Sequence, residues 1–387
     1  MIYLDYNATT PIDPRANQAA HVWYTEKFGN ASSRDHAWGW DASEAVEDSR
    51  QALAEFVNGV SVEIAFTSGA TESLNATIKG FVGYTGWENK MIVTSATEHD
   101  AVLAPCRSLQ EVTGIEVEIL PVDRQGRIDL DQLRFAVSSD KRILVVLMAA
   151  NNEIGTIHPL REISRIAHEA GVLFLCDITQ AVGKMPIDIR ADGIDLAAFS
   201  AHKIYGPKGV GALFIRGGSP EIDLEPLIVG GGQEHGLRGG TLNVPGIVGF
   251  GEACNIAQQE WKDEAERVCR LRSRLEHALL AELPDIWING DRENRIPNTS
   301  NIGFSGVDAR TLIRDMHDIA VSTQAACSSA KTGPSHVLKA IGLTDDEAYS
   351  CIRFSLGRFT IEQEIDYTIS KVVNSVRKLR HQMSHAI

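Results

Sequence analysis

The sequence lacks the long apolar run that a membrane protein needs. A membrane-spanning helix takes about 20 consecutive apolar residues, and no such run occurs among the 387 residues. The first residues, Met1–Asn7, also lack the basic region and apolar core of a secretion signal. We therefore expect a cytoplasmic protein with no membrane partner.

Closely spaced cysteine pairs and an excess of basic residues are also missing. The six cysteines are scattered, without a Cys-x-x-Cys motif, which predicts reduced thiols and argues against a disulfide framework or a metal site. The 37 basic residues are outnumbered by 51 acidic ones, and the formal charge is −14. This balance argues against nucleic-acid binding by the surface as a whole, so we expect no direct nucleic-acid partner.

What the sequence does contain is an alternation of apolar runs and amphipathic stretches in its first two thirds. Residues 90–94, 143–148, 171–176 and 209–216 have the composition of buried strands, and residues 160–170 have the apolar spacing of a helix. Strands that alternate with helices are typical of a parallel sheet. The predicted fold class is α/β, with a mostly parallel central sheet and helices on both faces.

A long helical pattern, from about Val248 to Leu283, separates this part from the rest of the chain. The shorter patterns that follow it predict a smaller α+β unit. We expect a large domain of residues 15–257 and a small domain formed by residues 1–14 and 258–387.

A turn of small residues, Thr67–Ser73, stands between an apolar stretch and a helical pattern. Backbone N–H groups and the positive end of the dipole at a helix start can hold a phosphate. Taken alone, these residues also fit an ordinary helix start capped by Thr67 or Ser68, which is a common arrangement.

Asp177 and Lys203 each stand at the end of an apolar run, where α/β sheets bind their ligands. A carboxylate there can keep a pyridine nitrogen protonated, and a lysine at the mouth of a buried strand can form an imine with a carbonyl cofactor. Asp177 alone could equally be a helix N-cap. A phosphate-binding turn, a ring-nitrogen carboxylate and a carbonyl-binding lysine, in that order, together predict pyridoxal phosphate.

Two further residues are candidates for catalysis. His99 follows an apolar strand, so its imidazole could stack on the cofactor and move protons, although a lone histidine is more often structural. Cys327 lies in a stretch of small and polar residues, about 322–334, which predicts a loop where a thiol can act as a nucleophile. It could also be a tolerated surface thiol.

Arg353 and Asn152 are candidate anchors for a substrate carboxylate. A planar guanidinium can bind a carboxylate through two hydrogen bonds. The alternative for an arginine in a strand pattern is a surface salt bridge.

Together these motifs resemble the class V aminotransferases, a group of fold-type I pyridoxal-phosphate enzymes, and among them most closely the cysteine desulfurases. The resemblance extends over nearly the whole chain. It rests on residues 4–11, 28–36, 67–73, 97–99, 151–155, 200–203, 238–243 and 352–358.

The resemblance implies that Lys203 forms the imine with the cofactor, that His99 stacks on the ring, and that Asp177 pairs with the ring nitrogen. It also implies that Gln180 binds the ring hydroxyl. The residues that it implies around the cofactor phosphate are Ala70, Thr71, Ser200, His202 and, across a homodimer, Thr241 of the partner subunit.

For the reaction, the resemblance implies that Asn152 and Arg353 hold the carboxylate of L-cysteine. Cys327 would attack the substrate sulfur, leaving a persulfide and L-alanine, and the sulfur would pass to an acceptor protein. Iron–sulfur assembly, tRNA thiolation and DNA sulfur modification all draw on such enzymes. Gln324 stands where the family usually has glycine, which predicts a stiffer segment before the cysteine.

Three alternatives remain open. A selenocysteine lyase or another class V aminotransferase would share the cofactor-binding residues. A NAD-dependent dehydrogenase would fit the sheet, but no Gly-x-Gly-x-x-Gly motif follows the first strand. A non-catalytic sulfur-relay scaffold would need no cofactor.

Overall fold

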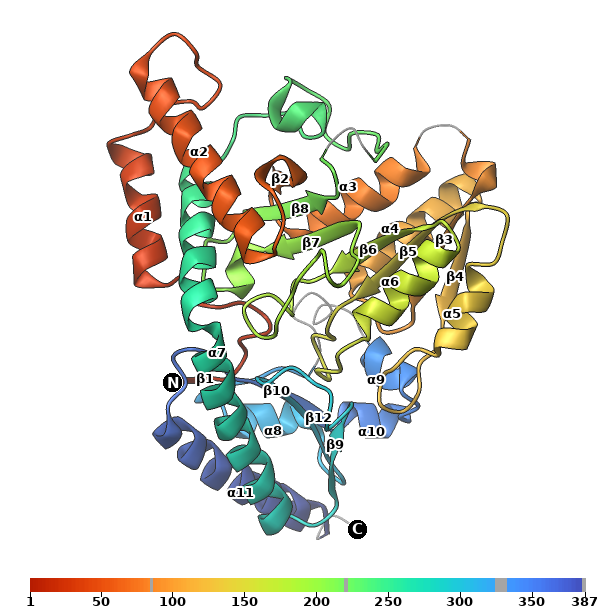
Figure 1. Cartoon of the computed structure of the whole chain (residues 1–387). Coiled ribbons are helices and arrows are strands. Elements are labelled where there is room, and N and C mark those ends of the chain that lie inside the picture. Colours follow the sequence, from red (N-terminus) through yellow and green to blue (C-terminus); the bar gives the residue numbers. More distant parts are fainter. Residues whose placement is uncertain (84–85, 219–221, 324–332, 385–387) are drawn as a thin grey trace.

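A seven-stranded sheet forms the centre of the molecule in the computed structural model, which describes residues 1–83, 86–218, 222–323 and 333–384 (Figure 1). The strand order is β2-β8-β7-β6-β5-β3-β4, and only β8 runs against its neighbours. The strands are β2 Ile64–Thr67, β3 Lys90–Ser95, β4 Glu116–Leu120, β5 Arg142–Met148, β6 Leu173–Asp177, β7 Leu196–Ser200 and β8 Gly211–Ile215. The predicted mostly parallel sheet is confirmed.

Helices cover both faces of this sheet, as predicted. In β5, Leu144 and Val146 point into one apolar cluster, while Val145 and Leu147 point into another, because successive side chains of a strand face opposite ways. Burial on both faces explains why the central strands are continuous apolar runs. The first cluster packs against α3 Ala70–Val82 and α4 Asp100–Thr113. The second packs against α2 Ala37–Phe56, α5 Leu130–Ala136, α6 Leu160–Glu169 and the first half of α7 Val244–Glu282.

The edge strand β4 was not predicted. Its sequence, Glu116-Val-Glu-Ile-Leu120, is largely exposed and has no continuous apolar run. A strand at the edge of a sheet is solvated on one side, so it lacks the apolar signal that marks the central strands.

A smaller three-stranded antiparallel sheet lies at the other end of α7 (Figure 1). Its strands are β9 Ile286–Asn289, β10 Thr299–Phe304 and β12 Cys351–Ser355, and a short parallel pair joins β1 Ile2–Tyr3 to β11 Ile319–Ala320. An apolar cluster packs this sheet against α7, α8 Ala309–Asp315 and α11 Glu362–Ser384. The remaining helical elements are α1 Pro14–Thr25, α9 His336–Ala340, α10 Asp345–Tyr349, η1 Ser61–Glu63, η2 Trp87–Asn89, η3 Ala201–Lys203 and η4 Gln233–Gly236.

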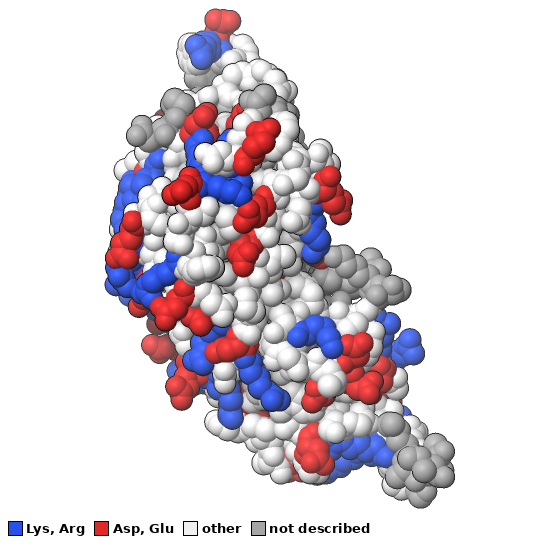
Figure 2. All heavy atoms as spheres, turned by 90° about the vertical axis from the view of Figure 1, so that its right-hand side faces the viewer, with Lys and Arg blue, Asp and Glu red and all other residues white. Residues whose placement is uncertain are grey.

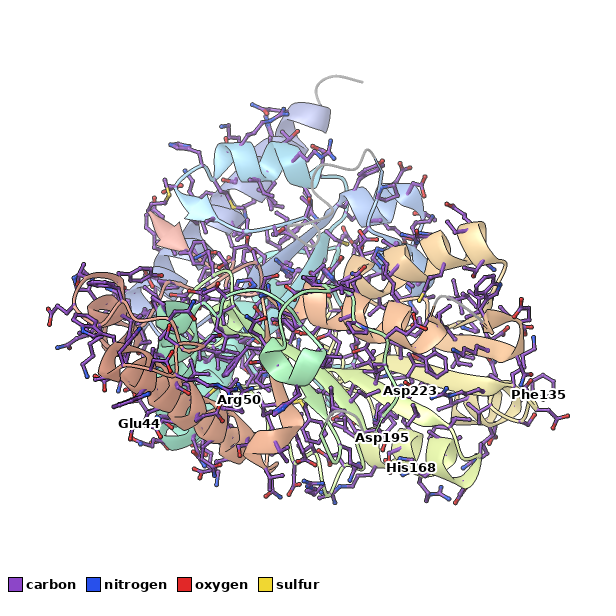
Figure 3. The ribbon with its side chains drawn as sticks, turned by 90° about the horizontal axis from the view of Figure 1, so that it is seen from above. Glu44, Arg50, Phe135, His168, Asp195 and Asp223 are labelled. Carbon is purple, nitrogen blue, oxygen red and sulfur yellow. The ribbon has the colours of Figure 1, made fainter. Side chains whose placement is uncertain are left out.

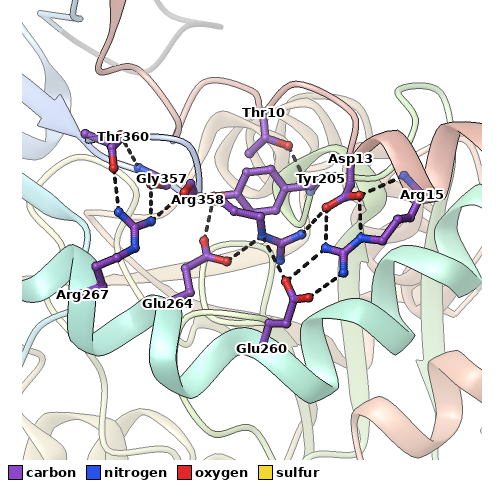
Figure 4. Close-up of polar contacts among 10 residues, drawn as sticks. All are labelled: Thr10, Asp13, Arg15, Tyr205, Glu260, Glu264, Arg267, Gly357, Arg358 and Thr360. Carbon is purple, nitrogen blue, oxygen red and sulfur yellow. Dashed lines mark hydrogen bonds and ion pairs between the residues drawn. The ribbon is translucent and has the colours of Figure 1, made fainter. Parts of the chain in front are cut away.

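A polar network holds the N-terminal segment and the long helix together between the two sheets (Figure 4). The guanidinium of Arg358 binds Asp13 and, on α7, Glu264, each at 2.8 Å. The hydroxyl of Tyr205 donates to Glu264 at 2.7 Å and accepts the N–H of Arg358 at 2.5 Å. Hydrogen bonds from Arg15 and Arg358 hold the pKa of Asp13 well below its usual range, although burial opposes this. Because Tyr205 follows Lys203 by two residues, the network also fixes the turn that carries Lys203.

A second buried ion pair joins α2 to the segment around η4, and its arginine, Arg50, is labelled in Figure 3. Arg50 binds Glu234 at 2.7 Å, and the same carboxylate accepts the N–H of Phe66 in β2 at 2.7 Å. A buried pair with additional hydrogen bonds specifies one arrangement of its segments. It places residues 233–236 against the outer strand of the sheet.

The surface carries charges of both signs. On the face shown in Figure 2, basic and acidic side chains of the described residues are interspersed. Within the part of the chain that the structure describes, no helix is long and apolar enough to cross a membrane.

Candidate active site

A cavity of about 410 Å³ lies where the parallel strands of the large sheet end, the place where such sheets bind ligands. Of the residues predicted for the site that the structure describes, all but Thr241 line it. The predicted residues that line it are Ala70, Thr71, His99, Asn152, Asp177, Gln180, Ser200, His202, Lys203 and Arg353.

Helix α3 begins at this cavity without a capping side chain. Its N-cap is Gly69, at a φ of +154° that other residues rarely adopt. A Cβ atom on Gly211 of β8 would lie 2.5 Å from the Cα of Gly69, so this close approach also requires glycine. The alternative of a helix capped by Thr67 or Ser68 is therefore wrong. The first N–H groups of α3 lack acceptors within the helix, which suits them to an anion.

Asp177 is the last residue of β6 and is buried. Turns follow it, so the alternative of a helix N-cap is wrong. Its Oδ1 accepts the N–H of Thr179 at 2.9 Å. This hydrogen bond holds the carboxylate at the carboxyl end of the strand, beside the cavity.

Lys203 stands in η3, directly after β7. Its Nζ donates to the backbone carbonyls of Asn7 and Ala8, the second at 2.8 Å. The N-terminal segment thus holds the amine in the cavity. The next residue of this segment, Thr9, contacts His202 through its Oγ1, 3.0 Å from Nδ1 of the imidazole.

Burial and, to a smaller extent, the positive charges of Lys203, Lys208 and Lys184 together lower the pKa of His202 to about 3. The imidazole is therefore neutral near pH 7. Lys203, Lys208 and Arg353 line the cavity, and these basic side chains favour an anionic ligand there.

His99 is the N-cap of α4, and its Nδ1 accepts the N–H of Ala101 at 3.0 Å. His99 therefore has a structural role as a helix cap. The same ring also lines the cavity, so the cap is compatible with the predicted role at the cofactor, which stays a prediction. Since Nδ1 accepts a hydrogen bond, the neutral ring carries its proton on Nε2.

Glu98, beside His99, is completely buried. Its Oε1 accepts hydrogen bonds from the Ser95 hydroxyl at 2.9 Å and from the N–H of Met148 at 3.0 Å. Burial raises the pKa of Glu98 to about 8, and the nearby carboxylate of Asp177 raises it as well. Glu98 is therefore mainly protonated at pH 7 and adds no second full charge beside Asp177.

Arg353 is buried in β12, so the alternative of a surface salt bridge is wrong. Its Nη2 binds Asp5 at 2.7 Å and its Nη1 donates to the carbonyl of Asn152 at 2.9 Å. Its buried Nε has no partner among the described residues. The guanidinium thus keeps one unused hydrogen-bond donor, and Arg353 is among the residues that line the cavity.

One predicted residue that the structure describes, Thr241, does not line this cavity. Thr241 is exposed, three residues after Arg238, which pairs with Glu72 at 2.9 Å on the cavity wall. Cys327 and Gln324 lie outside the described residues. Of the remaining cysteines, Cys106, Cys176, Cys254 and Cys351 are buried and Cys269 is partly exposed.

The prediction missed three parts of the site. The segment Asn7–Thr9 lines the cavity and binds Lys203, and only the resemblance of residues 4–11 pointed to it. Nothing in the sequence marked Glu98 or Lys184 as part of the site. Their importance follows from the groups that surround these side chains, and those groups come together only in the folded protein. Lys184 donates to Oε1 of Gln180 at 2.5 Å.

The donors and acceptors of the cavity fit pyridoxal phosphate. The uncapped start of α3 suits a phosphate, the buried carboxylate of Asp177 suits a protonated ring nitrogen, and the amine of Lys203 suits a carbonyl carbon. The Nε donor of Arg353 suits the carboxylate of an amino acid.

Comparison with known proteins gives a consistent result. The family model Aminotransferase class-V matches residues 2–368. The chain belongs to the class V aminotransferases. A curated cysteine desulfurase, IscS from Anaeromyxobacter sp. (strain Fw109-5), is 49% identical over 379 residues, covering 98% of this chain and 93% of the relative. The counterpart from Rickettsia typhi is 46% identical and covers 98% of this chain and 92% of its own.

A solved structure described as a NifS-like protein superimposes with a TM-score of 0.89 and 37% identity, covering 96% of this chain and 98% of that one. These findings confirm the predicted family, the fold type and pyridoxal phosphate as cofactor. They also confirm that this class V aminotransferase is an enzyme of the cysteine desulfurase type.

Proposed function

We propose that this enzyme binds pyridoxal phosphate through Lys203 and transfers the sulfur of L-cysteine to Cys327, releasing L-alanine. The observation that carries the proposal is the single cavity that joins the uncapped start of α3, the carboxylate of Asp177, the amine of Lys203 and the guanidinium of Arg353.

In this proposal, the phosphate lies at the start of α3 and is bound by Ala70, Thr71, Ser200 and His202. Asp177 holds the ring nitrogen, Gln180 donates to the ring oxygen, and His99 stacks on the ring. When bound, the cofactor supplies a carbonyl carbon that condenses with amines and a protonated ring that withdraws electrons.

Arg353 and Asn152 would hold the carboxylate of the substrate. The guanidinium already binds Asp5 and the Asn152 carbonyl, so its plane is fixed before cysteine arrives, and Nε remains as a donor. A fixed arginine would limit the orientations of the substrate in the cavity that Lys203 also lines.

Two groups can move protons at the substrate. The neutral amine of Lys203, released when the substrate takes its place, can accept the proton from Cα. His99 carries its ring proton on Nε2, because Nδ1 accepts the N–H of Ala101, so it suits the role of proton donor. These assignments make Lys203 the base and His99 the acid.

Sulfur transfer would then follow at Cys327. The thiolate attacks the sulfur of the bound cysteine, and an S–S bond forms as the Cβ–S bond breaks. The electron pair of the broken bond goes to the Cβ side, which takes up a proton and becomes the methyl group of L-alanine. Cys327 retains the sulfur as a persulfide, and no outside oxidant is needed.

The described residues on both sides of the Cys327 segment support this role. Ser322 is hydrogen-bonded through its backbone to Arg353, a residue of the cavity wall. His336 binds the carbonyl of Glu98, next to His99, at 2.9 Å. Cys327 stands five positions after Ser322, and an extended chain of that length reaches about 17 Å.

We further propose a cytoplasmic homodimer in which Thr241 reaches the phosphate of the partner subunit. Phe28, Trp38 and Trp40 are each more than half exposed, and exposed apolar patches mark interaction surfaces. Trp40 and Leu242, the neighbour of Thr241, line one groove. A second copy that covers this groove would bury the aromatic side chains and bring Thr241 to another cavity.

The remaining proposals concern the domains and the acceptor. Residues 15–257 would form the large domain, and residues 1–14 with 258–387 the small one that carries Cys327. The acceptor would be a protein thiol that takes the persulfide sulfur.

A selenocysteine lyase or another class V enzyme is the alternative, and turnover of cysteine compared with selenocysteine separates these candidates.

A single-turnover experiment with Cys327→Ser tests the proposal. In the wild-type enzyme, L-cysteine should yield one L-alanine per chain and add the mass of one sulfur atom to the peptide that contains Cys327. The variant should still bind the cofactor but form neither product. Cys269→Ser is the matched control, because Cys269 is also partly exposed, and it should behave like the wild type. Undiminished sulfur release by Cys327→Ser would contradict the proposal.

A further inference from the structure

Lys184 has no part in the reaction proposed above, yet it lies beside the reacting groups. It stands in the turn after β6, four residues beyond Gln180. The N–H groups of Val182 and Lys184 bind the carbonyls of Ile178 and Ala181, each at 3.0 Å. The backbone thus turns as in a helix, which places residues four apart on one side, and the Nζ of Lys184 donates to Gln180 Oε1 at 2.5 Å.

Two contacts decide which end of the Gln180 amide faces the cofactor. The ammonium of Lys184 can only donate, and the carbonyl of Asn7 can only accept. Oε1 therefore faces Lys184, and Nε2 donates to the Asn7 carbonyl at 3.0 Å. The same carbonyl accepts a hydrogen bond from Lys203, so the NH₂ group of Gln180 lies beside the amine that binds the cofactor.

The surroundings of Lys184 disfavour a positive charge, although its side chain is partly exposed. Desolvation, with the positive charges of Lys203 and Arg353, lowers the pKa of Lys184 to about 7, and the charge of Glu264 on α7 opposes this. Among the residues that the structure describes, no carboxylate pairs with Lys184. A lysine in these surroundings costs free energy that a methionine of similar length would not, so a role other than stability accounts for it.

We propose that Lys184 is a positioning residue: by binding Oε1, it holds Gln180 so that Nε2 donates to the ring oxygen of pyridoxal phosphate. This inference rests on the proposed function. Without Lys184, the amide can turn over and present Oε1 to that oxygen, and two acceptors repel one another. Lys184 acts only through Gln180 and touches neither cofactor nor substrate.

A double-mutant cycle on the full-length apoenzyme tests this coupling. The dissociation constant of pyridoxal phosphate is measured for the wild type, Lys184→Met, Gln180→Leu and the double variant. We expect Lys184→Met to weaken binding about tenfold in the wild-type background and to have no further effect in the Gln180→Leu background. Equal weakening in both backgrounds, or no weakening at all, would overturn the inference.

The thermal unfolding midpoint of the apoenzyme separates positioning from a structural role. At about pH 6, below the pKa of Lys184, the wild type holds a charged side chain where desolvation and the charges of Lys203 and Arg353 disfavour it. The midpoint of Lys184→Met should therefore be higher than that of the wild type, although its cofactor binding is weaker. A lower midpoint would mean that Lys184 supports the fold, and would overturn the inference.

Lys208→Met is the matched control, because it removes one positive charge from the wall of the cavity that Gln180 lines. Its effect on cofactor affinity should be the same with Gln180 and with Leu at position 180. If Lys208→Met showed the same dependence on Gln180 as Lys184→Met, the loss of a positive charge would explain both effects and the inference would fail.

A wild-type apoenzyme that binds no pyridoxal phosphate would overturn the proposed function together with this inference. An additive cycle in a functional enzyme would overturn the inference alone.

Discussion

The backbones of Ser322 and Arg353 exchange two hydrogen bonds, from the Ser322 N–H at 3.2 Å and from the Arg353 N–H at 2.7 Å. On the far side of the segment that contains Cys327, the Ser335 hydroxyl donates to the buried carboxylate of Glu153 at 2.5 Å. The chain is thus fixed at Arg353 before this segment and, after it, at the turn that follows β5. If Cys327 carries the sulfur as proposed, its segment is anchored by described residues on both sides.

Replacing Lys203 with alanine should abolish covalent attachment of the cofactor, because the amine of Lys203 is the one held in the cavity by Asn7 and Ala8. After reduction with borohydride, the wild-type peptide that contains Lys203 should carry the mass of the cofactor. Lys208→Ala, a second lysine of the same cavity wall, should remain labelled at Lys203. Labelling of Lys184 or Lys208 in the wild type would contradict the assignment.

Replacing Glu98 with glutamine should change how stability depends on pH. Because the pKa of Glu98 is raised from 4.5 to about 8, the folded protein keeps a proton that the unfolded chain releases in this interval. The contribution of Glu98 to the free energy of unfolding therefore falls as the pH rises from 4.5 to 8. Glutamine does not titrate, so the variant should gain on the order of 5 kcal/mol relative to the wild type across this window.

Urea unfolding of the apoprotein at about pH 5 and about pH 9 measures this difference. Glu63→Gln is a suitable comparison, because Glu63 is also buried but pairs with Arg190. Parallel pH profiles for the wild type and Glu98→Gln would show that Glu98 is ionised in the folded protein.

Replacing Tyr205 with phenylalanine should destabilise the junction between the two sheets. The hydroxyl donates to Glu264 and accepts the N–H of Arg358, and its loss leaves both groups without that partner in a buried place. We expect a loss of about 1–2 kcal/mol in the free energy of unfolding, measured in urea. Tyr367→Phe, at an exposed tyrosine that binds Asp318, should change the same quantity by less than about 0.5 kcal/mol. Equal effects of the two substitutions would mean that the network does not hold the junction.

Mixed dimers can show whether Thr241 acts across the subunit interface. One chain carries Lys203→Ala and the other carries Thr241→Val. If Thr241 serves the partner subunit, one site of the mixed dimer combines an intact Lys203 with an intact Thr241, and it should bind the cofactor with wild-type affinity. If Thr241 serves its own chain, no site is intact and the mixed dimer should bind no better than the Thr241→Val homodimer.

The central strands and the long helix could be predicted because their signals are local. The run Ile143–Met148 is apolar throughout since both of its faces are covered, and the observed strand is Arg142–Met148. The helix predicted over about 248–283 is observed as Val244–Glu282. The edge strand β4 escaped prediction because solvent on one side weakens its apolar pattern.

The sequence by itself determined the fold class, the cofactor and the order of the chemical groups along the chain, because small-residue turns and strand-end side chains have recognisable local chemistry. The tertiary structure decided which groups act together. It showed that Gly69 leaves α3 uncapped, that Arg353 is buried against Asp5, and that Lys184 faces Gln180. Burial, charge and hydrogen-bond orientation depend on segments far apart in the chain, so these relationships exist only after folding.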